Sequence, residues 1–299
     1  MEKTIGERIV DAMPFLDGAS DVVQPKVRDL VDAGGTTARN ILDGVWMEVP
    51  LHPVLTDVPI GSWTAALIFD GLDLVSGRPA MRNAADASLA VGVAGGFAAA
   101  AVGFSDWRYL SGGSRRMGMA HAVSNSVGLA LNTASLLLRA SGHRNAGRLA
   151  FLAGYSLNGI GAHLGGELSY KYGLRVNRNA FENTGPDDFV PVLDETELSQ
   201  DEMRRVEVSG TAVLLSRSGK DGRVCAIAAT CNHMGGPLEQ GDREGDTVVC
   251  PWHESRFDLC SGKTIDGPAV FPQSGYQTRV REGKIEVKTV EENIQEKVR

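Results

Sequence analysis

The sequence CNHMGGPLEQG occupies Cys231–Gly241, and CPWHESRFDLCSG occupies Cys250–Gly262. Each stretch opens on a cysteine and soon reaches a histidine, with one residue between them in the first stretch and two in the second. Sixteen residues separate His233 from Cys250. Thiolates and imidazoles are common ligands of zinc and iron in proteins. The two stretches therefore predict a metal centre built from two loops.

Short, alternating apolar segments surround the two stretches. They include RRVEV, TAVLL, RVCAIAA, TVVC and IEVKTV, and turn pairs such as Asp221-Gly222 and Glu282-Gly283 separate them. Alternation with a period of two residues indicates strands with one buried face. We expect an all-β module in which Cys231 follows the strand VCAIAAT and Cys250 follows TVVC.

Zinc is the first alternative for this set of side chains, because two cysteines and two histidines can form a tetrahedral site. Zinc fingers, however, usually separate paired ligands by two or more residues and place the histidine pair on one helix. The single residue between Cys231 and His233 does not fit that spacing. The spacing therefore favours another metal centre.

The pattern C-x-H, sixteen residues, C-x-x-H resembles the Rieske family. The resemblance extends to the Gly-Gly-Pro after His233, the Ser-Gly turn after His253 and a proline loop at Asp266–Ala269. It implies a [2Fe–2S] cluster with two cysteines on the inner iron, Cys231 and Cys250, and two histidines on the outer iron, His233 and His253. The family pattern also implies a set of positions around the cluster: Gly235, Gly236, Trp252, Ser255, Phe257 and Pro268.

Departures from the family pattern bear on the reduction potential. High-potential, quinol-oxidising relatives carry two further cysteines where this chain has Gly236 and Trp252. Those relatives also donate hydrogen bonds from a serine and a tyrosine, whereas this chain keeps Ser255 and has Phe257. Fewer donors stabilise the reduced, more negative cluster less. We therefore predict a potential in the lower part of the Rieske range of about −150 to +300 mV.

Composition limits the classes of function. A chain of 299 residues has room for two domains, and its net charge of −7 argues against a nucleic-acid partner. Of its four cysteines, two belong to the paired motif. We expect Cys225 to be a core residue and Cys260 a turn residue. We find no secreted disulfide framework and no cleaved export signal in the sequence, which favours a reducing compartment.

Four apolar stretches precede the β-module, at Val58–Phe69, Ala87–Phe104, Met117–Leu138 and Leu149–Gly166. The last three carry no charge over 18, 22 and 18 residues, which is long enough to span a bilayer. A soluble four-helix bundle is the alternative. The prediction is a multidomain protein with an N-terminal all-α four-helix bundle, transmembrane, and a C-terminal all-β Rieske-type iron–sulfur module.

The helical half is similar to an uncharacterised family of predicted four-helix membrane domains. The matching residues are His52-Pro53, Pro59-Ile60-Gly61, His163 and Gly166-Glu167. The predicted domains are an amphipathic N-terminal segment (1–50), the helical membrane domain (51–172), a linker (173–186), the Rieske domain (187–290) and a polar tail (291–299).

Helix direction predicts a second candidate site. Because antiparallel helices alternate in direction, one membrane face would collect His52, Asp106, His121, His163 and Glu167. Ionisable groups near a membrane core are functional candidates. Two of these histidines could ligate a b-type haem, or the group could bind the head of a quinone or relay protons. The alternative is that each side chain caps or bonds a neighbouring helix.

Together these features predict a membrane-tethered, ferredoxin-like carrier that performs one-electron transfer. We expect it to be an electron-transfer component of an oxidoreductase system rather than a self-sufficient enzyme, placed between a soluble reductase or other donor and a membrane or soluble acceptor. The expected location is the cytoplasmic (inner) membrane, in contact with lipid, with the Rieske domain facing the cytoplasm.

Two other functions were weighed against the carrier. One is a redox-sensing or interaction module whose cluster state controls partner binding. The other is a Rieske oxygenase, which needs a mononuclear iron held by two histidines and a carboxylate. No histidine follows His253 in this sequence, so the oxygenase is disfavoured.

Overall fold

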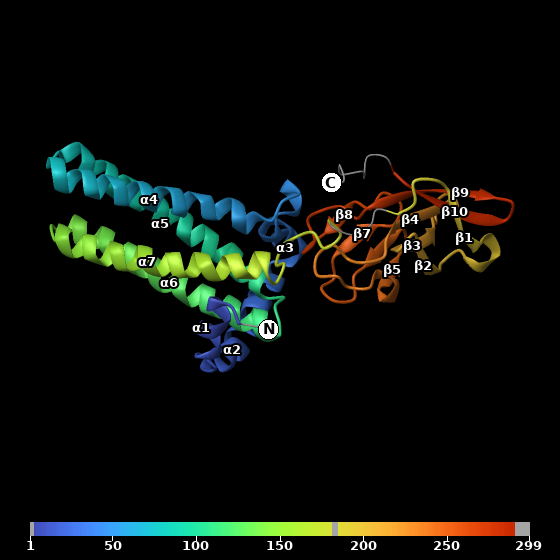
Figure 1. The fold of residues 1–299 in the computed structure, drawn as a ribbon, viewed down its shortest axis with the longest axis horizontal. Coiled ribbons are helices and arrows are strands. Elements are labelled where there is room, and N and C mark those ends of the chain that lie inside the picture. Colours follow the sequence, from blue (N-terminus) through green and yellow to red (C-terminus); the bar gives the residue numbers. More distant parts are fainter. Residues whose placement is uncertain (1–2, 181–184, 291–299) are drawn as a thin grey trace. The chain divides into compact units, whose positions relative to one another are not determined.

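The structure is a computed structural model that describes residues 3–180 and 185–290 (Figure 1). Two compact units make up the chain. The described residues up to Asp43, together with Pro50–Leu174, form a helical unit, and Gly44–Val49 with the described residues from Arg175 onward form a β unit. The predicted polar tail (291–299) and part of the predicted linker (181–184) lie outside the described residues.

The described part of the helical unit contains seven α-helices. Three come first: α1 (Ile5–Asp11), α2 (Phe15–Ala33) and α3 (Gly35–Asp43). Four long helices follow: α4 (Leu51–Ser76), α5 (Pro79–Trp107), α6 (Gly112–Ala140) and α7 (Arg144–Tyr170). The predicted class, helices followed by an all-β module, is confirmed, although the N-terminal segment adds three helices to the four expected.

The four long helices pair as two hairpins, α4 with α5 and α6 with α7 (Figure 1). One apolar cluster is shared by all four helices: Trp63, Ala66, Leu89, Val93, Leu129 and Phe151. The backbones of the two hairpins approach most closely along α5 and α6 and over only a few residues between α4 and α7. Side chains join α4 to α7, including the Thr64 and Tyr155 hydroxyls, which lie 3.0 Å apart.

Buried charges tie the two hairpins together. Arg139 of α6 pairs with the buried Asp70 of α4 and lies 3.0 Å from the Asp86 carboxylate of α5. Arg148 of α7 pairs with Asp73 of α4 and lies 3.3 Å from the Asp70 carboxylate. Buried charges are tolerated when each one has a partner. These ion pairs thus join the α4–α5 hairpin to the α6–α7 hairpin.

Two of the four long helices, α4 and α5, are long and apolar enough to cross a membrane by length and composition. Four spans were predicted from the sequence. Within the described residues, α6 and α7 fall short of the same hydropathy, because asparagine, serine and histidine interrupt their uncharged stretches.

The β unit consists of two antiparallel sheets. The larger has the strand order β1-β10-β9-β4-β3-β2 and the smaller β5-β6-β7-β8. Their strands are β1 (Val190–Asp194), β2 (Met203–Val208), β3 (Thr211–Arg217), β4 (Val224–Ala228), β5 (Asp242–Glu244), β6 (Thr247–Val249), β7 (Arg256–Asp258), β8 (Thr264–Asp266), β9 (Gly275–Arg281) and β10 (Lys284–Thr289). Three 3₁₀ turns belong to the same unit: η1 (Val45–Met47), η2 (Glu195–Glu197) and η3 (Leu238–Gln240).

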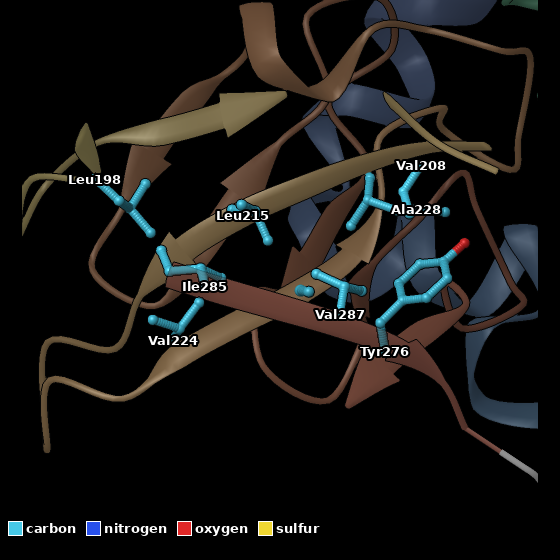
Figure 2. Packing of buried hydrophobic residues seen from close by; sticks show 10 residues of the cluster. Leu198, Val208, Leu215, Val224, Ala228, Tyr276, Ile285 and Val287 are labelled. Carbon is cyan, nitrogen blue, oxygen red and sulfur yellow. The ribbon is translucent and has the colours of Figure 1, made fainter. Parts of the chain in front are cut away.

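Alternation along the strands builds two cores on opposite faces of the larger sheet. Val213 and Leu215 of β3 and Val224 of β4 join one core (Figure 2). Leu214 and Ile227 point to the other face and pack with the smaller sheet. Successive side chains of a strand point to opposite faces. Ala229 and Cys231, two and four residues after Ile227, accordingly pack in the second core.

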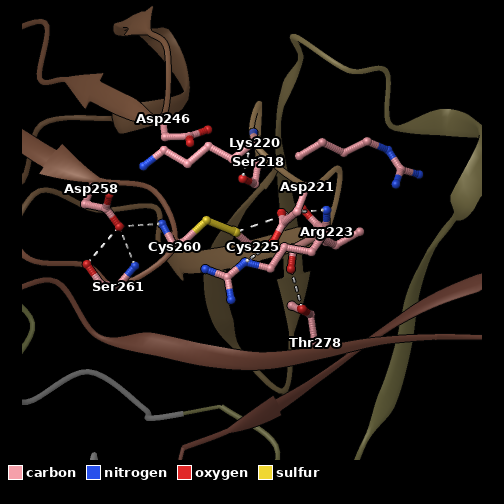
Figure 3. Close-up of a disulfide and its surroundings, with 12 residues drawn as sticks. Ser218, Lys220, Asp221, Arg223, Cys225, Asp246, Asp258, Cys260, Ser261 and Thr278 are labelled. Carbon is pink, nitrogen blue, oxygen red and sulfur yellow. Dashed lines mark hydrogen bonds and ion pairs between the residues drawn. A yellow bond between two sulfur atoms is a disulfide. The ribbon is translucent and has the colours of Figure 1, made fainter.

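A disulfide joins Cys225 of β4 to Cys260 in the turn between β7 and β8 (Figure 3). Cys225 is buried and Cys260 lies in a turn, as expected from the sequence. The expectation was wrong in treating the two cysteines as unpaired, because they form a disulfide. Cys225 lies two residues before Ile227 and so faces the smaller sheet. The carboxylate of Asp258 accepts a hydrogen bond from the backbone N–H of Cys260 at 3.1 Å and orders the turn that carries it.

We predict that Cys260→Ser lowers the free energy of unfolding by about 3–4 kcal/mol, the value expected for closing a loop with a sequence separation of 35 residues. Urea unfolding of the full chain, followed by the cluster's visible absorption, measures the change. Cys225→Ser should give the same loss, and the double variant should lose no more than either single one. Additive losses would contradict a bond between these two residues.

Candidate metal centre

The first predicted ligand loop continues from β4. Cys231 lies four residues beyond Ile227 and belongs to the core between the two sheets. Its backbone N–H donates to the Gly236 carbonyl at 2.8 Å, and the Gly235 N–H donates to the Cys231 carbonyl at 2.8 Å. Gly235 adopts a φ of 85°, which favours glycine. The loop is thus closed immediately around the cysteine.

The second predicted ligand loop joins β6 to β7 and repeats this design. The Cys250 N–H donates to the Ser255 carbonyl at 2.8 Å, and the Glu254 N–H donates to the Cys250 carbonyl at 3.0 Å. Glu254 has a positive φ of 63°, at the position equivalent to Gly235. Both loops therefore use the same pair of hydrogen bonds, four and five residues after the cysteine. The motifs C-x-H and C-x-x-H therefore differ only in where the histidine stands within the loop that these two hydrogen bonds close.

The two loops bring their four predicted ligands together as two like pairs. The side chains of Cys231 and Cys250 lie in the same buried cluster between the two sheets. The imidazole rings of His233 and His253 lie 5.1 Å apart, centre to centre, with an angle of 85° between their planes. The sulfur pair lies in the protein core, and His253 is partly exposed to solvent.

Backbone N–H groups favour negative charge on both sulfurs, whereas burial opposes it. The hydrogen bond from Cys231 lowers the pKa of Cys250 to about 7, helped by the backbone N–H groups of Trp252 and His253. The same hydrogen bond raises the pKa of Cys231, while the backbone N–H groups of His233 and Met234 act in the opposite direction. Each sulfur therefore faces two backbone N–H donors, an arrangement that suits thiolates bound to a metal.

The geometry fits tetrahedral iron at the histidine pair. With metal–nitrogen bonds of about 2.0–2.1 Å, two imidazoles on one tetrahedral metal have ring centres about 5.2 Å apart. The observed 5.1 Å agrees with this value. In residues 3–180 and 185–290, no three His, Cys, Asp or Glu side chains converge on a point that could hold a single ion. Paired thiols beside paired imidazoles therefore suit a binuclear cluster better than one zinc ion.

The predicted neighbours of the cluster have distinct positions. A β-carbon on Gly236 would lie 2.8 Å from the Cys250 Sγ, so only glycine fits there without a shift. The Ser255 hydroxyl accepts a hydrogen bond from the Ala269 N–H at 2.9 Å, which leaves its own proton free to donate. Phe257 is fully buried in the core between the sheets, whereas Trp252 is 55% exposed.

The proline loop and the predicted linker both contact the ligand loops. Pro268 follows a cis peptide bond, and its carbonyl accepts a hydrogen bond from the Arg175 guanidinium at 2.6 Å. The Arg178 N–H donates to the Asn232 carbonyl at 2.9 Å, and the Asn179 side chain donates to the Thr230 carbonyl at 2.8 Å. Sequence reasoning missed this role for residues 175–179. The polar composition of this stretch indicated a linker, and nothing in it pointed to the contacts of Arg175 and Asn179.

The five candidate residues of the helical unit separate into groups. The rings of His52 and His121 lie 6.2 Å apart, centre to centre. His163 is half-exposed and lies 3.2 Å from the Glu167 carboxylate. Glu167 itself accepts hydrogen bonds from the Thr4 hydroxyl at 2.6 Å and the Gly6 N–H at 2.9 Å, so it anchors the start of α1. Asp106 is buried near the end of α5.

Comparison with known proteins agrees with this geometry. Residues 188–288 match the family described as "Rieske [2Fe-2S] domain", and residues 48–178 match "Predicted membrane protein (DUF2231)". Ferredoxin CarAc of Metapseudomonas resinovorans is 32% identical over 85 residues, which cover 28% of this chain and 78% of the ferredoxin. The chain therefore belongs to the Rieske [2Fe–2S] family and joins a Rieske domain to a DUF2231 domain.

Two further similarities each cover about a third of the chain. Apoptosis-inducing factor 3 of Mus musculus is 28% identical over 99 residues, which are 33% of this chain but only 16% of that protein. The solved ferredoxin of carbazole 1,9a-dioxygenase from Nocardioides aromaticivorans IC177 is 28% identical, with a TM-score of 0.32 over 34% of this chain and 98% of the ferredoxin. Family membership identifies a Rieske-type electron-transfer protein and implies a [2Fe–2S] cluster.

We predict that Gly236→Ala reduces the iron and sulfide content of the purified protein several-fold, because the new β-carbon displaces the Cys250 sulfur. Gly275→Ala is the matched control, since a β-carbon there meets nothing within 4 Å. Iron and acid-labile sulfide analysis measures both variants. Equal, full cluster content in the two variants would contradict the predicted place of Cys250 in the site.

Proposed function

We propose that this chain is a membrane-tethered Rieske electron carrier, an electron-transfer component rather than a self-sufficient enzyme. The observation that carries the proposal is that Cys231 lies with Cys250 in one buried cluster and that the rings of His233 and His253 lie together as a second pair. Two thiolates on one iron and two imidazoles on the other are the ligand set of a Rieske cluster. The bound cluster would supply a single-electron couple.

The two ligand pairs have different roles in this proposal. Cys231 and Cys250 hold the inner iron, where backbone N–H donors offset the negative charge. His233 and His253 hold the outer iron, and neutral imidazoles in place of thiolates raise its potential. Because His253 is partly exposed and Trp252 beside it is 55% exposed, electrons enter and leave past the second loop.

A soluble reductase or a comparable donor is the proposed source of electrons, and a membrane or soluble acceptor receives them. The ferredoxin relative and the family match support the carrier role. The DUF2231 match and the apolar helices α4 and α5 support a membrane tether in contact with lipid. The cytoplasmic (inner) membrane, with the Rieske domain on the cytoplasmic face, stays a prediction. The cysteine content had favoured the cytoplasmic face because no disulfide was expected, and the Cys225–Cys260 disulfide removes that argument.

The carrier role predicts that substitutions of Cys250 and Cys260, two cysteines of the same stretch, have very different effects on the rate of electron transfer. Cys250→Ser should abolish electron transfer from a ferredoxin reductase to cytochrome c through the full-length protein, because the inner iron loses a ligand. Cys260→Ser should keep most of the rate, since Cys260 contacts Cys225 and not the cluster.

Stopped-flow absorption at the cluster bands measures this transfer. The carrier requires that the cluster be reduced and reoxidised within each turnover. A cluster that is reduced once and reoxidised only by air, with no transfer to any acceptor, would instead favour the sensor alternative.

The surroundings of the cluster predict its midpoint potential. Phe257 supplies no hydrogen-bond donor at the position where high-potential relatives have a tyrosine, and Gly236 and Trp252 occupy the positions of their extra cysteines. We expect a potential in the lower part of the range of about −150 to +300 mV. Redox titration followed by electron paramagnetic resonance measures it, and a midpoint above roughly +200 mV would reject the argument.

A further inference from the structure

The two helical hairpins hold one histidine each in the same way. In the first hairpin, the Nδ1 of His52 on α4 lies 2.9 Å from the Ala99 carbonyl of α5. In the second, the Nδ1 of His121 on α6 lies 2.8 Å from the Gly161 carbonyl of α7. His52 is the second residue of α4 and His121 is the tenth residue of α6, and each binds the backbone of the second helix of its hairpin.

A glycine stands one turn beyond each of these carbonyls. A β-carbon on Gly103 would lie 2.7 Å from the Cε1 of His52, and one on Gly165 would lie 2.9 Å from the Cε1 of His121. The same device, a carbonyl that anchors the imidazole and a glycine that makes room for it, therefore occurs twice. The two copies face each other across the bundle, with ring centres 6.2 Å apart.

The carbonyl contacts fix the protonation of both rings. A carbonyl oxygen only accepts hydrogen bonds, so the Nδ1 of each ring carries the proton and donates it. The Nε2 of each neutral ring then carries a lone pair, and the Nε2 of His121 lies 3.4 Å from the Asn125 side-chain nitrogen. Metal-bound histidines nearly always donate their other N–H to a carboxylate, a backbone carbonyl or water in this way.

The distance between the His52 and His121 rings indicates how the two imidazoles could bind one metal ion. With metal–nitrogen bonds of about 2.0–2.1 Å, two imidazoles on opposite sides of one metal have ring centres about 6.4 Å apart. The 6.2 Å between His52 and His121 is near this limit, whereas the 5.1 Å between His233 and His253 fits a tetrahedral angle. A quinone ring hydrogen-bonded at both ends would hold the imidazoles more than about 10 Å apart.

The other ligands of such a metal must come from the bound group itself. No third His, Cys, Asp or Glu in residues 3–180 and 185–290 joins the pair to form an ion site. A porphyrin supplies its own equatorial nitrogens and leaves two axial positions for histidines. The sequence contains no C-x-x-C-H motif for covalent attachment.

Two of the helices that hold the histidines, α4 and α7, also expose apolar side chains, which suits an apolar ligand. Apolar side chains that are 40–54% exposed lie on these two helices: Val54, Val58, Ile60 and Ile160. We propose that His52 and His121 are the axial ligands of a b-type haem, a second one-electron centre in the helical unit. This inference goes beyond the proposed carrier function and does not depend on it.

The first test is the absorption spectrum of the full-length protein, purified in detergent from cells supplied with haem precursors. The proposal predicts about one haem per chain by pyridine haemochrome assay, with the sharp Soret and α bands of a six-coordinate, low-spin iron on reduction. Colour from the [2Fe–2S] cluster alone, with less than a tenth of a haem per chain even after incubation with hemin, would overturn it. Stoichiometric copper in place of haem would overturn it equally.

Variants then test which residues bind the haem. His52→Ala and His121→Ala should each lower the haem content at least tenfold or leave a high-spin, five-coordinate spectrum. His163→Ala should keep the original spectrum, because His163 pairs with Glu167. Low-spin, six-coordinate haem in both His52→Ala and His121→Ala would overturn the assignment, as would its loss in His163→Ala with retention in the other two.

Adjacent glycines provide a test that leaves both histidines in place. Gly165→Ala pushes the His121 ring and should lower haem content or change its spin state, whereas Gly166→Ala meets nothing within 4 Å and should do neither. Intact cluster absorption and unchanged helical circular dichroism identify the variants that have folded. Identical haem spectra for Gly165→Ala and Gly166→Ala would count against the site.

Discussion

The β unit depends on one constraint: two loops must present two sulfurs together and two imidazoles together within a few ångströms. The structure satisfies it by building both loops alike, with the cysteine N–H bonded to the carbonyl five residues later and the cysteine carbonyl bonded to the N–H four residues later. Because the cysteines end up in the core between two sheets, the sheets fix their separation. The disulfide, the proline loop and residues 175–179 then hold the loops from outside.

The helical unit solves a similar problem with different means. Its two hairpins are joined by polar as well as apolar contacts, because the backbones of α4 and α7 come close over only a few residues. Buried pairs such as Arg139 with Asp70 join the hairpins at one end, and the N-terminal helices pack around the other, where Gln24 donates to the carbonyls of Trp107 and Leu110. Between these fixed ends, His52 and His121 are each bound to a backbone carbonyl and so keep a defined orientation.

Much of this was predictable because the decisive signals are local. The spacing of Cys231, His233, Cys250 and His253 is read directly from the sequence, and helix alternation was enough to expect His52 near His121. Contacts between residues that are far apart in the sequence could not be predicted. Cys225 faces Cys260 only because β4 and the β7–β8 turn meet in three dimensions. Likewise, Asn179 lies in a stretch with the composition of a linker, and only the folded loop provides the Thr230 carbonyl that its side chain binds.

The central claim is that the two like pairs hold a binuclear cluster. Metal and acid-labile sulfide analysis of the anaerobically purified, full-length protein, combined with electron paramagnetic resonance after dithionite reduction, tests it most directly. The account predicts the iron and sulfide of one [2Fe–2S] cluster per chain and a Rieske-type signal that appears on reduction. One tightly bound zinc per chain, without sulfide or signal, would contradict it.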